Sequence, residues 1–119
     1  MRVSVFRVEK PRGGAGPYGR SEHYEELAEM YKEHDQGDHP SPDDDPMLGG
    51  MYDEEHCGFA TIDALDTWFD GYQETLQDCG YIIAVYTVPL RAVRYGQKQL
   101  VFRRGDYVPS RTMPVTVSY

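Results

Sequence analysis

The most apolar stretch of the chain is Tyr81–Val88, a run dominated by β-branched and aromatic residues that ends at Pro89. It shows none of the polar alternation expected of a strand with one face in water. The pattern therefore predicts a strand that is buried on both faces and lies at the centre of a sheet. Three further strands are predicted after it, at residues 92–95, 99–103 and 115–119, with a turn around Gly105.

The N-terminal residues 2–9 also follow the pattern of a strand, in which side chains alternate between two faces. Val5 and Arg7 share one of these faces, and Phe6 and Val8 share the other. An arginine on an apolar face either pairs with a carboxylate or lines a ligand site, and both interpretations stay open. The next segment, 10–20, is rich in glycine and proline, which predicts a loop that could close over a site.

Two segments repeat apolar residues at helical spacing. The first is predicted as a helix over 22–33, with Ser21 as its N-cap. The second begins after Thr61, its predicted N-cap, and ends at Gly80, which suits the C′ position of a helix. Gly71 lies inside this second helix, at a cost of about 1 kcal/mol relative to alanine.

The order of these elements predicts one α+β domain over residues 1–119, with a mixed or mainly antiparallel sheet, two helices and a long acidic loop at 34–56. Residues 34–55 contain three prolines, three glycines and eight acids. Long loops of small domains more often bind partners than carry catalytic groups. The partner-binding residues predicted on this loop are Asp35, Asp38, Asp43, Asp44, Asp45, Asp53, Glu54 and Glu55.

Charge is distributed unevenly along the chain, whose net charge is −8 and whose isoelectric point is about 4.8. Between Glu33 and Leu90 there are fourteen acids and neither lysine nor arginine, whereas residues 91–119 hold six bases and one acid. This asymmetry indicates a partner with a basic surface and argues against direct binding of nucleic acid. The alternative interpretation is that the acids only solvate the surface.

Several site classes are not expected from the sequence. It lacks the ligand spacing of zinc sites and of calcium loops, so we predict no metal. Cys57 and Cys79 do not form a disulfide framework, and we expect two reduced thiols. The N-terminus lacks an apolar signal core and no apolar run is long enough for a membrane span, so we expect a cytoplasmic protein without a membrane partner.

The segment Gln99–Tyr107, with the sequence QLVFRRGDY, resembles the closing motif of ADP-ribosyltransferases of the arginine–serine–glutamate class. Phe6-Arg7-Val8 resembles the first strand of that family, whose arginine helps to hold NAD, and Gly58–Thr61 resembles its serine-threonine-serine strand. The resemblance implies an NAD site around Arg7, Thr61, Gln97 and Gln99.

The chain departs from that family at the catalytic position, because Gln99 stands where the family has a glutamate. A carboxylate there stabilises an oxocarbenium-like transition state by its charge, and an amide cannot. The resemblance therefore implies a catalytically inactive relative more readily than an enzyme. The chain also resembles small bacteriophage proteins that begin with a YRVE-like strand and end near a KQVVF-like strand, and that often act on host or defence proteins.

Together these features predict a small phage-type binding protein without a cofactor. It would inhibit or redirect a host protein, such as a nucleic-acid-handling or defence protein, through its acidic surface, as anti-CRISPR-type inhibitors do. The alternative is an ADP-ribosyltransferase-like enzyme, or an inactive relative that binds NAD or another nucleotide. A third interpretation is a domain without a ligand, whose acids keep it in solution.

Overall fold

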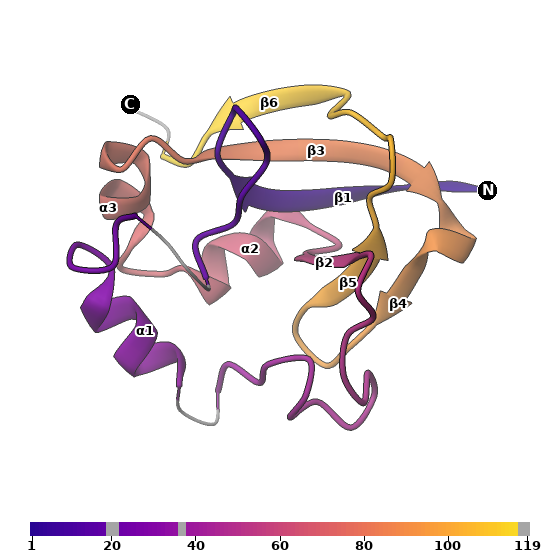
Figure 1. The fold of residues 1–119 in the computed structure, drawn as a ribbon, viewed down its shortest axis with the longest axis horizontal. Coiled ribbons are helices and arrows are strands. Elements are labelled where there is room, and N and C mark those ends of the chain that lie inside the picture. The colour runs from indigo at the N-terminus through magenta and orange to yellow at the C-terminus, as the bar shows by residue number, and fades with distance from the viewer. Residues whose placement is uncertain (19–21, 36–37, 117–119) are drawn as a thin grey trace.

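The apolar run forms the central strand of a sheet, as predicted. In the computed structural model, which describes residues 1–18, 22–35 and 38–116, β3 (Ile82–Pro89) lies between β1 (Arg2–Glu9) and β6 (Arg111–Pro114) and is antiparallel to both (Figure 1). Both faces of β3 are buried, because its side chains alternate between two core clusters. Ile83 and Val85 enter one cluster, and Ala84, Tyr86 and Val88 enter the other.

A second antiparallel sheet has the strand order β2-β5-β4. Its strands are β2 (Glu55–Gly58), β5 (Leu100–Arg103) and β4 (Val93–Tyr95), and a 3₁₀ turn over Leu90–Ala92 connects β3 to β4. The α+β class is therefore confirmed, and the mixed or mainly antiparallel sheet is realised as two antiparallel sheets of three strands.

The two sheets meet where β1 passes the end of β2. Phe6 and Phe59 exchange two backbone hydrogen bonds, each with an N···O distance of 2.8 Å. Gly58 permits this approach, because a Cβ atom there would lie 2.5 Å from Val5 Cγ1 and 3.2 Å from the Phe6 carbonyl oxygen. This contact brings the middle of β1 against the second sheet.

The first helix, α1 (Ala28–His34), begins six residues later than predicted. Residues 22–27 instead form turns, in which Leu27 N–H donates to the His23 carbonyl oxygen and Ala28 N–H to that of Glu25. The structure gives α1 no side-chain N-cap hydrogen bond, and the predicted cap Ser21 lies outside the described residues.

The second predicted helix is two helices, α2 (Ile62–Trp68) and α3 (Gln73–Asp78). The prediction of one continuous helix is wrong because Gly71 adopts a φ of +90°, which a right-handed helix does not allow. The predicted start and the predicted end of this helical segment are both confirmed. Thr61 Oγ1 accepts a hydrogen bond from Ala64 N–H at 3.0 Å, and Gly80, also at φ +90°, ends α3 in a Schellman motif.

The last predicted strand is misplaced. The sequence favours 115–119, but β6 ends at Pro114, and residues 117–119 lie outside the described part of the chain. Val115 is buried in the core between the first sheet and the helices. The side chains of β6 are mostly exposed, as on an edge strand, so no apolar pattern marks it in the sequence.

None of the helices in the described ranges is long and apolar enough to cross a membrane. In Figure 1 the first sheet lies along the top, α3 lies beside its left end, and α1, α2 and the second sheet lie beneath it. The loop between α1 and β2, largely free of regular structure where it is described, runs below the second sheet.

We expect Gly58→Ala to lower the free energy of unfolding by about 1–3 kcal/mol, because the added methyl group overlaps the side chain of Val5. Urea denaturation measures the change. A matched control is Ala60→Ser, an exposed position two residues away, which should change stability by less than about 0.5 kcal/mol. Equal stability of the two variants would show that the sheets tolerate a wider separation.

Candidate functional site

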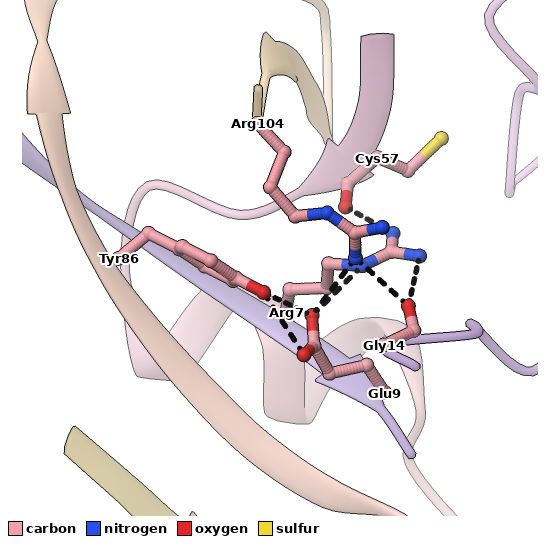
Figure 2. A network of polar contacts seen from close by, with 6 residues as sticks. All are labelled: Arg7, Glu9, Gly14, Cys57, Tyr86 and Arg104. Atoms are coloured by element: carbon pink, nitrogen blue, oxygen red, sulfur yellow. Dashed lines mark hydrogen bonds and ion pairs between the residues drawn. The ribbon is translucent and has the colours of Figure 1, made fainter. Parts of the chain in front are cut away.

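Arg7 is the most deeply buried arginine among the described residues, with 8% of its surface exposed. Its Nη1 donates to the Cys57 carbonyl oxygen at 2.8 Å, and its Nη2 lies 3.4 Å from the Gly14 carbonyl oxygen (Figure 2). Its Nε forms an ion pair with Glu9 Oε1 at 3.2 Å but makes no hydrogen bond. Burial lowers the pKa of the guanidinium, and Glu9 opposes that shift.

Glu9 connects the residues shown in Figure 2. It is 4% exposed and lies 3.6 Å from Arg104 Nη1, and its two carboxylate oxygens share the one hydrogen bond that the Tyr86 hydroxyl donates, with O···O distances of 2.7 and 2.9 Å. Two guanidinium groups therefore share one carboxylate. Among the described residues, two guanidinium groups and one carboxylate leave one positive charge that is mostly buried and has no ion-pair partner.

The glycine-rich loop predicted to close over a site packs directly on these arginines. A Cβ atom on Gly14 would lie 2.5 Å from Arg104 Nη1, and one on Gly16 would lie 2.9 Å from Arg7 Nη2. Arg104 Nη1 also donates to the Gly14 carbonyl oxygen at 2.9 Å. The glycines thus allow the loop to cover both guanidinium groups.

Arg7 and Gln99 line the same cavity, whose volume is about 180 Å³. The Gln99 amide is held by a 2.9 Å hydrogen bond to the Pro40 carbonyl oxygen. Neither Thr61 nor Gln97 belongs to the described lining, because Thr61 caps α2 and Gln97 lines a surface hollow beside Lys98. Two of the four residues implied by the transferase resemblance therefore meet, and two do not.

His56 and Cys57 also line the cavity, but they do not form an acid–base pair suited to catalysis at neutral pH. Burial, together with Arg104 and Arg7, lowers the pKa of His56 to about 4, so its imidazole is neutral at pH 7. Burial raises the pKa of the Cys57 thiol, which keeps it protonated and weakly nucleophilic.

Aromatic and histidine side chains form a hydrogen-bonded and stacked group that includes two residues of the cavity lining, Tyr18 and Trp68. Trp68 Nε1 donates to the Tyr18 hydroxyl at 2.7 Å, and Tyr18 also hydrogen-bonds to His34 Nδ1. The His34 and His39 rings stack with centroids 4.0 Å apart. Burial and the neighbouring His39 lower the pKa of His34 to about 4, so the His34 imidazole is neutral at pH 7.

Two of the acids predicted to bind a partner are buried and hold the acidic loop in place. Asp45 accepts hydrogen bonds from Met47 N–H at 2.8 Å and from Gln97 N–H at 2.7 Å. Glu55 pairs with Arg94 through contacts of 2.6 and 2.9 Å, and this pairing lowers the pKa of the carboxyl. The loop acids that the structure leaves exposed are Asp35, Asp38, Asp43, Asp44, Asp53 and Glu54.

Exposed acids also line α2 and the start of α3, which form what we call the acidic strip: Asp63, Asp66, Asp70 and Glu74. A surface hollow of about 700 Å³ lies against Asp66, Asp70 and Glu74, and no base belongs to its described lining. A second hollow of about 640 Å³ shares Thr67 with it and is lined by Asp38 and Asp63. Burial and the charge of Asp63 raise the pKa of Asp66.

Sequence reasoning missed Glu9, Tyr86 and Arg104. Glu9 could have been found, because residues two apart on a strand share a face and Arg7 on that face calls for a carboxylate. Tyr86 and Arg104 come from distant segments and leave no local signal. Within the described residues, no group of three or more His, Cys, Asp or Glu side chains is arranged to hold a metal ion.

The model of a family described as "Bacteriophage T4 Y00F protein" matches residues 1–116. No curated protein and no solved structure matches the chain. The comparisons therefore agree with the resemblance to phage proteins and give no support to the resemblance to ADP-ribosyltransferases.

We expect Glu9→Gln to lower the free energy of unfolding by about 3 kcal/mol, because the buried guanidinium of Arg7 and the partly buried one of Arg104 would lose the carboxylate they share. The matched comparison is Tyr86→Phe, which removes only the hydroxyl that donates to Glu9 and should cost about 1.5 kcal/mol. Chemical denaturation of both variants measures the difference. A Glu9→Gln loss no larger than that of Tyr86→Phe would contradict the shared ion pair.

Stability should also fall as the pH is lowered from about 6.5 towards 4. His34 and His56 have folded-state pKa values of about 4, below the ordinary value of 6.5, so the unfolded chain takes up their protons first. Each contributes stability that is complete above pH 6.5 and decreases by about 1.4 kcal/mol per pH unit below it. Urea denaturation of wild type and of the His34→Gln/His56→Gln variant at pH 7.5 and 5 tests this. The prediction is wrong if the free energy of unfolding of the two proteins depends on pH in the same way.

Proposed function

The chain belongs to the bacteriophage T4 Y00F protein family, and from this membership we propose that it acts in the host cytoplasm as a binding protein with an acidic surface. Its target would be a host protein with a basic surface, of the kind that handles nucleic acid or defends the cell. Binding would inhibit or redirect that protein.

The observation that carries the proposal is the number of exposed acids without ion-pair partners. Of the fourteen acids between Glu33 and Asp78, only Asp45 and Glu55 are buried, and both have internal partners. The other twelve are exposed, and none of them forms an ion pair within the described ranges. A basic partner would supply the missing counter-charges, which speeds association and selects the partner.

The acidic strip is the part of this surface best shaped for a partner. Its side chains border two adjoining hollows, one of which has no base in its described lining, whereas Lys98 lines the other. A partner's lysine or arginine side chain could therefore enter the first hollow. Burial and the charge of Asp63 raise the pKa of Asp66, so its ionised form is less favoured than that of an ordinary aspartate. A partner's cation placed beside Asp66 would offset that cost.

NAD binding by an inactive relative of ADP-ribosyltransferases is the second candidate function. One observation favours it, namely that Arg7 and Gln99 line one cavity. A volume of about 180 Å³ is close to the roughly 150 Å³ that accommodates benzene, and it cannot enclose a dinucleotide. The positions of Thr61 and Gln97 outside the cavity also disfavour this candidate.

Affinity capture from host lysate tests the binding function with two variants of equal charge. Asp63→Asn/Asp66→Asn/Asp70→Asn removes three charges from the acidic strip, and Glu25→Gln/Glu26→Gln/Glu29→Gln removes three exposed charges before and within α1. We expect the strip variant to lose a basic partner that wild type and the α1 variant retain. The dissociation constant for that partner should be at least tenfold higher with the strip variant than with wild type.

Salt dependence provides the second measurement. Because exposed charges are screened within about 10 Å at 0.1 M salt and 3 Å at 1 M, affinity for the captured protein should fall steeply between these concentrations. The proposal fails if affinity is independent of salt, or if both triple variants weaken binding equally.

A further inference from the structure

The cavity beside Arg7 has the composition of a small-molecule site. Its walls combine apolar surface from Phe59, Trp68 and Phe69 with polar groups from Arg7, His56 and Gln99. Mostly apolar walls with a few convergent polar groups are typical of ligand sites. At about 180 Å³, the cavity is slightly larger than one that holds benzene.

The charge of the site identifies the ligand as an anion. Arg7 and Arg104 share Glu9, so one positive charge in this mostly buried network lacks an acidic partner among the described residues. Arg7 Nε is buried and makes no hydrogen bond, and its acidic contact is the 3.2 Å ion pair with the Glu9 carboxylate that Arg104 also contacts. A buried charge without a partner is costly, and an anion in the cavity would remove that cost.

The size of the cavity and its aromatic walls narrow the class of anion. A bare inorganic anion would leave the walls of Phe59, Trp68 and Phe69 without contacts. A carboxylate pairs with a guanidinium through charge-assisted hydrogen bonds, and its apolar body would fill the remaining space. We propose that the cavity is a binding site for a small carboxylate whose apolar body is about the size of a benzene ring. This inference is independent of the acidic surface proposed to bind a host protein.

Trp68 provides the readout, because it is the sole tryptophan of the chain and lines the cavity. Benzoate should produce a saturable change in its fluorescence. Benzyl alcohol, which has the same ring without the charge, should bind at least tenfold more weakly. NAD and inorganic phosphate should produce no saturable change, because the first is too large and the second lacks the apolar body.

Two glutamines that are two residues apart provide matched variants. Gln99→Glu places a carboxylate in the cavity wall, where it would satisfy Arg7 and repel the ligand, so benzoate affinity should fall at least tenfold. Gln97→Glu adds the same charge at an exposed position outside the described lining and should leave affinity within about twofold of wild type. Thermal unfolding verifies that both variants are folded.

Three outcomes would overturn the proposal. They are the absence of a saturable benzoate signal, equal affinity for benzoate and benzyl alcohol, and equal loss of affinity in the two glutamate variants. A saturable NAD signal without one for benzoate would also reject it, in favour of a nucleotide site. If Gln99→Glu does not fold, the comparison of benzoate with benzyl alcohol on wild type still decides the charge requirement.

Discussion

The close contact between β1 and the end of β2 is the constraint on which the rest of the molecule depends. Through this contact a single strand serves both sheets, pairing with β3 along its whole length and bridging to Phe59 at its middle. The absence of a side chain at Gly58 makes the contact possible. Because Arg7 follows Phe6 directly, the same contact brings its guanidinium to the Cys57 carbonyl oxygen and into the cavity wall.

Buried and exposed acids differ in whether they have partners within the protein. Glu9, Asp45 and Glu55 are buried acids, and each is held by an arginine or by backbone N–H groups. The exposed acids of the long loop and of the acidic strip have no such partners in the described structure. Buried acids therefore stabilise the fold, whereas exposed acids are available for binding, and the two roles occur side by side in one segment of sequence.

Much of the fold was predictable because its signals are local. The apolar run of β3, the N-cap at Thr61 and the C′ glycine at Gly80 each depend on neighbouring residues, and each is confirmed. The break between α2 and α3 was missed, because a glycine inside an apolar helical repeat does not itself show that it will adopt a positive φ. The edge strand β6 was missed because its side chains are mostly exposed. The site was predictable only in part, since strand alternation places Arg7 on a face that requires a carboxylate, but nothing local connects it to Arg104. Composition likewise cannot separate Asp45 and Glu55, which are buried, from the acids around them.

Trp68 belongs to two environments at once. Trp68 lines both the cavity beside Arg7 and the surface hollow that also contains Asp38 and Asp63. An occupant that moved this ring on either side would alter the shape of the other side. Coupling between two sites is reciprocal. If a bound small molecule changed the affinity for a protein partner by some factor, the bound partner would change the affinity for the small molecule by the same factor. If both proposed sites are occupied in turn, a single aromatic side chain would make one binding event conditional on the other.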